Sequence, residues 1–443
     1  MRARTGFWSL SQKTKLSHFF FYSLLLFLPS QLGKHFWPNF SYVYGIRVDY
    51  LSPTFYFTDL LIVLLFASFV FENIKIFNKV RIHKKTSFEL FIFFLITLFL
   101  ISGIILAKNP TAGFYGLVKL FEFVFLISYT AKNFRKLNKK VIYSSFFIGV
   151  FFESLLTIAQ YFNQGSIGGI MYYFGERSFN SQTPGIANAS ISGQLFLRPY
   201  GTFPHPNLLA AYLFASMYLI LIFSTRLAFK YKNFFTYLIL FLGTLSLFLS
   251  LSRVAIIAWI LSIIFFLILI FWKKTGIDIV KKYKFKISEG LIAVFFVFLV
   301  IVVGFYIPTF GRFSGISLSD ESVIQREQLA TDAIIIFRNS PLQGAGINNF
   351  LINLPPVEKN LHQSFYLQPV HNIFLLVLSE TGVLGFILFL LFLIKIFLKI
   401  KQDRELLILF LGVIFLGFFD HYFLTLQEGQ ILFAFLIGVF LSF

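Results

Sequence analysis

The sequence predicts an all-α protein, a polytopic membrane bundle of about 12 transmembrane helices with a large helical loop on its outer side. Of its 443 residues, 57% are apolar and only 13% are charged, a balance that soluble domains do not show. Apolar runs long enough to cross a bilayer recur from about residue 17 to the C-terminus. Short clusters of Lys and Arg separate many of these runs, as expected for the loops between membrane helices.

The predicted spans follow the apolar runs. They cover residues 17–32, 55–72, 87–107, 113–131, 141–160, 206–224, 234–251, 253–271, 288–307, 371–394, 405–420 and 429–443. The first run follows a basic leader but lacks a small-residue cleavage site, so we expect a retained helix and not a signal peptide. The stretch 234–271 is too long for one span, and Ser250-Leu-Ser-Arg253 divides it.

The net charge of +19 reflects topology and not nucleic-acid binding, because the basic residues form no continuous patch. If the N-terminus is cytoplasmic, most of the 38 Lys and Arg residues lie in inside segments. The positive-inside rule gives the outer cations no orienting role. They are chiefly Arg177, Arg198, Arg253, Arg312, Arg326, Arg338 and Lys359.

Residues 1–443 are expected to form a single transmembrane domain with two long outer loops. The loop at 161–205 is rich in Gly, Ser, Asn and Pro, and the loop at 308–370 is large enough for a small subdomain. Within the second loop, residues 322–337 predict an amphipathic helix that opens with a capping box. One stripe of this helix carries Arg326, Ala330, Ala333 and Phe337.

Several kinds of chemistry are excluded. The chain has no cysteine, so it has neither a thiolate nucleophile nor an iron–sulfur cluster. It contains no Walker loop, dinucleotide fingerprint, HExxH sequence or nucleophile elbow. The one adjacent acid pair is Asp320-Glu321, so we expect no metal site and no cofactor.

Three outward-to-inward helices are predicted to begin beside a polar or cationic cluster, at Arg198–Asn207, Ser252-Arg253 and His371-Asn372. Helix N-termini offer unpaired amides, and arginine matches the geometry of phosphate. If the long loop folds back over the bundle, Arg326 joins them and the group forms a diphosphate site, with His371 as the proton acceptor. Each outer arginine also fits an ordinary surface ion pair, and that alternative stays open.

The helix that follows His371 carries two glycines on one face, Gly382 and Gly385, which would permit close helix contact. Glu380 lies deep in this span and therefore needs a buried partner. Glu122 and Glu153 also lie within spans, but we identify no intramembrane cation paired with any of the three, which argues against a pump. The remaining isolated histidines are expected to be structural; they are His18, His35, His83, His362 and His421.

These residues resemble a known family, the O-antigen ligase and O-antigen polymerase superfamily. His371-Asn372, nine intervening residues and Gly382-Val-Leu-Gly385 fit its ligase signature. Three further blocks resemble the family in the same order. They are Arg198–Asn207, Leu251-Ser252-Arg253, and Arg326 followed by Pro341–Gly346.

The resemblance implies a metal-independent, inverting glycosyltransferase in the bacterial inner membrane, with its site facing the periplasm or cell exterior. It would transfer a glycan from undecaprenyl diphosphate to an acceptor hydroxyl such as that of the lipid A core. His371 would be the catalytic base, and Arg253, Arg326 and, by a less specific match, Arg198 would bind the diphosphate. The supporting residues would be Asn372, Gly382, Gly385 and Asn207.

Two alternatives remain. A polymerase of the same superfamily would use another carrier-linked glycan as its acceptor. A non-catalytic flippase or exporter of lipid-linked glycans predicts cations along a path through both leaflets, whereas the outer cations cluster on one side. All three functions place the chain in a lipid bilayer with a carrier-linked glycan as partner, and none involves nucleic acid.

Overall fold

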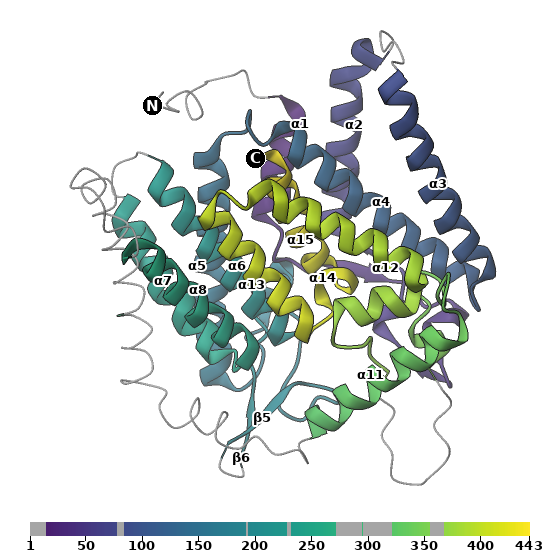
Figure 1. Cartoon of the computed structure of the whole chain (residues 1–443). Coiled ribbons are helices and arrows are strands. Elements are labelled where there is room, and N and C mark those ends of the chain that lie inside the picture. Colours follow the sequence, from purple (N-terminus) through teal and green to yellow (C-terminus); the bar gives the residue numbers. More distant parts are fainter. Residues whose placement is uncertain are drawn as a thin grey trace.

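A computed structural model describes residues 15–77, 84–191, 194–227, 232–271, 295, 321–354 and 367–443. Apart from residue 295, the predicted span at 288–307 lies outside these residues, as do His83, Arg312, Asp320, Lys359 and His362. The described chain is mostly helical (Figure 1). Its helices are α1 (Leu16–Leu26), α2 (Phe57–Phe77), α3 (Lys84–Leu106), α4 (Pro110–Asn133), α5 (Lys139–Asn163), α6 (Pro206–Arg226), α7 (Lys232–Leu249), α8 (Arg253–Phe271), α11 (Glu321–Asn339), α12 (Ile373–Ile400), α13 (Arg404–Phe419), α14 (Tyr422–Thr425) and α15 (Gln427–Ser442).

A helix lies at each predicted span within the described residues. Five of them are long and apolar enough to cross a membrane, namely Phe57–Ile74, Pro110–Asn133, Lys139–Asn163, Pro206–Ser224 and Ile373–Ile400. The total of about 12 crossings stays a prediction. The multi-pass helical character is confirmed.

Helix α6 is the centre of the bundle. Its apolar side chains point in every direction, and they pack against α5, α7, α8 and α13. Of the most apolar 18-residue stretch within Pro206–Ser224, 94% is buried. A helix that is hydrophobic all round requires such an environment. Helix α3 instead lies at the edge of the bundle, where its main helical neighbour is α4 (Figure 1).

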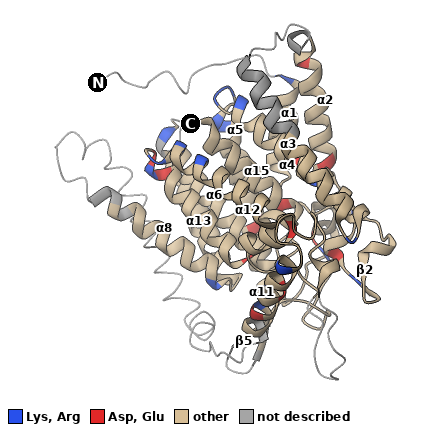
Figure 2. Ribbon diagram, turned by 45° about the vertical axis from the view of Figure 1, so that its right-hand side comes forward, with Lys and Arg blue, Asp and Glu red and all other residues tan. Residues whose placement is uncertain are grey.

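One end of the bundle is basic. Figure 2 shows many of the Lys and Arg residues gathered near the C-terminus of the chain. At this basic end, Arg135 Nε donates to the carbonyl of Ser442 at 3.0 Å, and Arg226 pairs with Asp403 at 3.0 Å and Glu405 at 2.8 Å. This is the end that the positive-inside rule assigns to the cytoplasm, although the orientation stays a prediction.

The opposite end carries short strands, so the expectation of an all-α fold was incomplete there. Three antiparallel two-stranded sheets pair β1 (Gly33–His35) with β4 (Thr54–Tyr56), β2 (Tyr42–Val43) with β3 (Ile46–Arg47), and β5 (Asn188–Ile191) with β6 (Gln194–Leu197), and the last two are hairpins. Short 3₁₀ turns accompany them at η1 (Asn39–Ser41), η2 (Asp49–Leu51), η3 (Gly169–Phe174) and η4 (Leu351–Asn353). Segments rich in Gly, Pro and Asn do not sustain helices, and local pairing satisfies their backbone groups.

A second hydrophobic core lies at this hairpin end. Val43 and Leu51 of the first loop pack with α11, η4 and the start of α12. The buried side chains of α11 are Leu329, Ala333 and Ile336. The predicted stripe was therefore partly right, since it included Ala333 and Ala330 packs against this core, but the buried face is offset toward Leu329 and Ile336. The domain division at 161–205 and 308–370 stays a prediction.

Helix α12 is broken at Gly382, which has φ 63° and ψ −170°. Residues 341–346 lie against the break, where Ala345 N–H donates to Ser379 O at 2.9 Å and Val383 N–H donates to Pro341 O at 2.8 Å. A Cβ on Gly382 would lie 2.4 Å from the carbonyl carbon of Leu342. The expectation that Gly382 permits close helix contact was therefore wrong, because this glycine permits a backbone contact with a loop.

The neighbouring residues of α12 depend on the same loop. The buried partner of Glu380 is backbone, since Phe350 N–H donates to its Oε1 at 3.1 Å. A Cβ on Gly385 would meet Thr381 Oγ1 at 2.2 Å, so this glycine makes room for the Thr381 hydroxyl, which donates to Val377 O at 2.7 Å. The signature glycines therefore shape α12 and its contact with the loop.

Replacing Gly382 with Ala should destabilise the protein by about 1–3 kcal/mol of backbone strain, with the overlap against Leu342 in addition. Thermal unfolding of the purified protein in detergent measures the effect. Gly103→Ala in α3 is the matched control, because its Cβ would approach nothing closer than 3.8 Å. An equal melting temperature for the two variants would contradict the assigned role of Gly382.

Candidate functional site

The segment before α6 positions a buried arginine. Arg198 is 7% exposed, and its Nε donates to Ser250 O at 2.9 Å. Its Nη2 donates to Asn207 Oδ1 at 2.6 Å. Pro206 opens α6, and His205 Nδ1 accepts the N–H of Asn207 at 3.1 Å as the N-cap. The prolines of this segment thus prevent a helix before Pro206, and this start places Asn207 in the first turn of α6.

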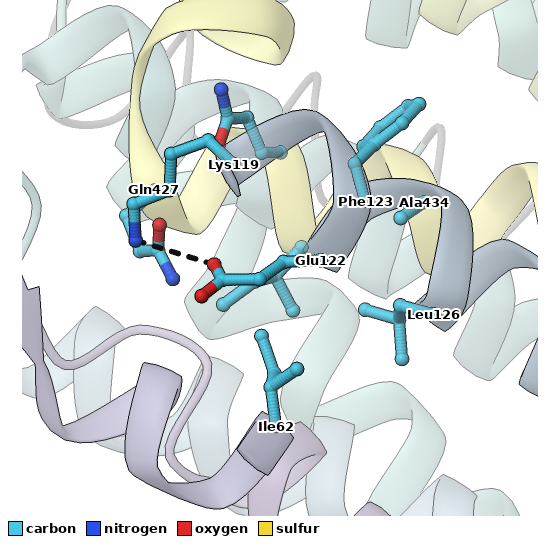
Figure 3. A pocket seen from close by; sticks show the side chains of 9 residues that line it. Ile62, Lys119, Glu122, Phe123, Leu126, Gln427 and Ala434 are labelled. Carbon is cyan, nitrogen blue, oxygen red and sulfur yellow. Dashed lines mark hydrogen bonds and ion pairs between the residues drawn. The ribbon is translucent and has the colours of Figure 1, made fainter. Parts of the chain in front are cut away.

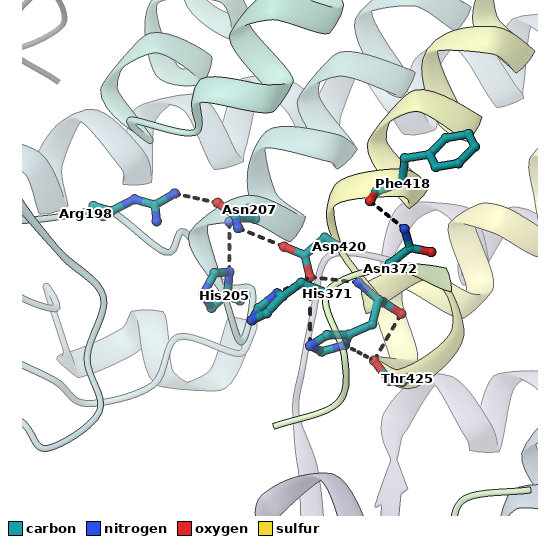
Figure 4. Close-up of polar contacts among 9 residues, drawn as sticks. Arg198, His205, Asn207, His371, Asn372, Phe418, Asp420 and Thr425 are labelled. Atoms are coloured by element: carbon teal, nitrogen blue, oxygen red, sulfur yellow. Dashed lines mark hydrogen bonds and ion pairs between the residues drawn. The ribbon is translucent and has the colours of Figure 1, made fainter. Parts of the chain in front are cut away.

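Asn207 connects this arginine to a buried carboxylate. Its Nδ2 donates to Asp420 Oδ2 at 2.8 Å, while the other carboxylate oxygen, Oδ1, lies 3.3 Å from His371 Nδ1 (Figure 4). Asp420 directly follows α13, and His371 directly precedes the N-cap of α12. The polar chain Arg198–Asn207–Asp420–His371 therefore joins the ends of three helices.

Asn372 fixes the start of α12. Its Oδ1 accepts the N–H groups of Phe374 at 2.8 Å and Leu375 at 3.0 Å, and its Nδ2 donates to Phe418 O at 3.1 Å. One side chain thus caps α12 and ties it to the last turn of α13. The contact fixes the position of the His371 backbone relative to the Asp420 backbone.

His421 completes the surroundings of Asp420. Its backbone N–H donates to Asp420 Oδ1 at 2.8 Å, its ring lies 5.1 Å from that of His371, and its Nδ1 lies 2.6 Å from Thr425 Oγ1. Burial lowers the pKa of His421 to about 3, although Asp420 opposes the shift. Burial acts against ionisation of Asp420, but the charge and hydrogen bond of His371 hold the pKa of this carboxyl well below its usual range.

The two other predicted arginines lie near this chain. Burial is the main cause of the lowered pKa of His205, and the charge of Arg326 adds to it, which places Arg326 within electrostatic range. Arg253 is the first residue of α8, and the turn before it, where Leu251 has φ 53°, supplies the Ser250 carbonyl that binds Arg198. The structure thus links Arg198 to Asn207 directly and connects both to His371 through Asp420. Arg326 lies within electrostatic range of His205, and Arg253 follows the turn that binds Arg198.

Comparison with known proteins gives one match to a family model. Residues 237–390 match the family described as O-antigen ligase. The resemblance to the O-antigen ligase superfamily is confirmed. The matched region includes Arg253, Arg326 and the whole His371 signature, whereas Arg198, Asn207 and Asp420 lie outside it. No curated protein matches the chain.

Sequence reasoning missed Asp420, which lies outside the matched region. The predicted span 405–420 absorbed the residue, because fifteen mostly apolar positions precede it. The available signal was the pair Asp420-His421, an acidic residue and a histidine at the outer end of a span. His421 was expected to be merely structural, yet it lies against the centre of the site.

The site contains a group that is able to bind a metal ion. Donor atoms of His371, Asp420 and His421 all lie within 4.8 Å of one another. Two imidazole nitrogens and a carboxylate oxygen suit Zn²⁺ or another first-row divalent ion. The same Asp420 oxygen, however, already serves the His371 ring and the His421 backbone.

A second buried polar group lies between α2, α4 and α15. Lys119 Nζ pairs with Asp59 at 2.8 Å and with Glu122 at 3.2 Å. Gln427 also donates to Asp59. A small pocket lies beside Glu122, lined also by Lys119 and Gln427 (Figure 3). The expectation that no intramembrane cation pairs with Glu122 was wrong, because a single lysine within the apolar span of α4 changes a hydropathy average little.

Acidification should destabilise the site through His421. Its pKa is about 3 in the folded protein against 6.5 ordinarily, so between these pH values the unfolded chain binds a proton that the folded chain does not. Above pH 6.5 His421 therefore leaves the free energy of unfolding unchanged. As the pH falls from 6.5 toward 3, it lowers the free energy of unfolding by up to about 1.4 kcal/mol per pH unit. Melting temperatures of wild type and His421→Gln between pH 8 and pH 4.5 measure it. The variant should show the smaller decrease, and parallel curves would refute the assignment.

Proposed function

We propose that the protein is a membrane glycosyltransferase of the O-antigen ligase type. It takes a glycan from undecaprenyl diphosphate and transfers it to an acceptor hydroxyl, such as one on the lipid A core, at the periplasmic face of the inner membrane. The observation that carries this proposal is the buried pair of His371 and Asp420, linked through Asn207 to Arg198. A histidine oriented by a carboxylate is a general base, and arginine binds phosphate.

The imidazole supplies the proton acceptor. Because Asp420 accepts the hydrogen bond, the assigned tautomer has its proton on Nδ1 of His371 and a lone pair on Nε2. Nε2 takes the proton of the acceptor hydroxyl as its oxygen attacks the anomeric carbon. The bond from this carbon to the diphosphate oxygen breaks on the opposite face, its electron pair leaves with the diphosphate, and the configuration inverts.

The cations stabilise the leaving group. Arg198 is held by Ser250 and Asn207, so its guanidinium loses little further freedom when a diphosphate binds. Arg253 and Arg326 supply additional positive charge, and α6, α8 and α12 begin at this side of the bundle with the positive ends of their dipoles. Such preorganised charge acts most strongly on the transition state, in which the diphosphate becomes more negative.

A polymerase of the same superfamily would use this machinery with a second carrier-linked chain as acceptor. Product analysis separates the two activities, since a polymerase lengthens carrier-linked chains and a ligase depletes them into an acceptor-linked product. A flippase gives no function to the His371–Asp420 pair. We therefore favour transfer over transport.

His371→Gln should abolish transfer, and Asp420→Asn should lower its rate by about 10²–10⁴, the effect of losing an orienting carboxylate. Purified protein, undecaprenyl-diphosphate-linked glycan and a defined acceptor constitute the assay, and the product is followed by gel mobility and mass spectrometry. His18→Gln is the control, since His18 lies among cations of the basic end. A variant counts only if it elutes as wild type in size-exclusion chromatography, and full transfer by folded His371→Gln would disprove the base.

Chelation should leave the transfer rate unchanged, because the proposed chemistry needs no divalent ion. Added Zn²⁺ should inhibit, since His371, Asp420 and His421 would bind it and occupy the base. Activity with EDTA and with graded Zn²⁺ measures both effects. Loss of activity in EDTA and its recovery with a divalent ion would show that transfer requires a metal ion and would contradict the proposed chemistry.

A further inference from the structure

The loop that follows α5 has a strongly apolar surface. In residues 167–174, which we call the aromatic loop, Ile170 is 66% exposed, Tyr172 57% and Tyr173 74%. Ile167 and Phe174 are also exposed. Five large apolar side chains in eight residues would be costly to leave in water.

The aromatic loop lies at the depth of the bilayer. The Phe174 ring is 5.4 Å from the ring of Phe152 on α5. Phe152 follows Lys139, where α5 begins at the basic end, by a helical rise of about 20 Å, less than the ~30 Å of a hydrocarbon core. Phe174 therefore lies level with the outer third of that core.

The apolar surface continues from α5 into the loop. Ile148, Leu155 and Phe162 are exposed on α5, at 51%, 47% and 74%. These side chains face lipid if α5 spans the membrane, as its length and composition indicate. The aromatic loop extends this lipid-facing surface of α5, so its exposed side chains also face lipid.

The loop is fastened at its polar base. Glu176 is 3% exposed and accepts the N–H groups of Ile167 and Gly168, each at 2.7 Å, together with Gln160 Nε2 at 2.8 Å. Gly175 has φ 106°, and a Cβ there would lie 2.8 Å from the backbone N of Gln31. Satisfied backbone groups are what irregular chain requires at membrane depth.

We propose that the aromatic loop is an interfacial anchor that inserts into the acyl chains of the outer leaflet. Its two tyrosines suit the boundary between headgroups and chains, where aromatic residues with a polar end concentrate. Gln160, which binds Glu176, also binds the backbone of Gly201 near Arg198, with Nε2 donating to Gly201 O at 2.9 Å. The anchor thereby fixes the height of the segment before α6 relative to the membrane surface. The alternative occupant, a sugar stacked on the tyrosines, would require them to lie in water.

Single cysteines test the anchor directly, because the chain has none of its own. Tyr173→Cys and, independently, Ile170→Cys are spin-labelled in proteoliposomes, and their accessibility to oxygen and to a water-soluble nickel chelate is compared by EPR. Ser181→Cys, exposed in the same connection, is the aqueous control, and Phe121→Cys on α4, where Phe121 is 58% exposed, is the lipid control.

Labels at 173 and 170 should resemble the lipid control, with oxygen favoured over the nickel chelate several-fold relative to 181. Nickel accessibility equal to that of 181 at both positions would overturn the proposal. A decrease of that aqueous accessibility on addition of glycan would instead identify a sugar platform. Because this readout needs no transfer activity, its outcome is independent of the proposed enzyme.

Discussion

Asp420 is a carboxylate buried at the end of a bundle helix, and much of the site follows from the need to satisfy it. Its side chain is 7% exposed, so ionisation without partners would cost several kcal/mol. Asn207 donates to one oxygen, and His371 and the His421 backbone approach the other. Because Asn207 in turn accepts from Arg198, the positions of α6, α12 and α13 are set by one charge and its partners.

The break in α12 serves the same arrangement. A straight helix from Asn372 would continue through Gly382, but the carbonyls of Ser379 and Glu380 accept the N–H groups of Ala345 and Gly346. The loop that makes these bonds begins two residues after α11, the helix of Arg326. The glycine signature therefore connects the histidine helix to the arginine helix through backbone hydrogen bonds of 2.8–2.9 Å. A Cβ on Gly344 or Gly382 would lie 2.4 Å from a carbonyl carbon of the facing segment, so this approach requires glycine.

Hydropathy predicted the helices because span length is a property of the chain and the bilayer alone. The arginines were predicted as site residues because cations on the side opposite the basic end need another explanation, and His371 was predicted from its place in the signature. Their roles stay proposals. Asp420 and the Lys119–Asp59 pair were missed, since each becomes meaningful only beside a partner more than forty residues distant. The offset of the α11 stripe has the same origin. The first outer loop, which supplies Val43 and Leu51 to that core, decides which side of α11 is buried.

The two buried polar groups differ in what they leave for a ligand. Lys119 has two carboxylates as partners, and Asp59 also accepts from Gln427. The polar atoms of this group therefore bind one another and connect α2, α4 and α15. The His371 group instead presents a ring whose second nitrogen lies away from Asp420. Only the short helix α14 separates His421 from Gln427. The Lys119 group therefore fixes the chain that follows Asp420, while Asn207 fixes the Asp420 side chain. Because Asp420 is held in this way, it orients the His371 imidazole with little loss of conformational entropy when substrate binds.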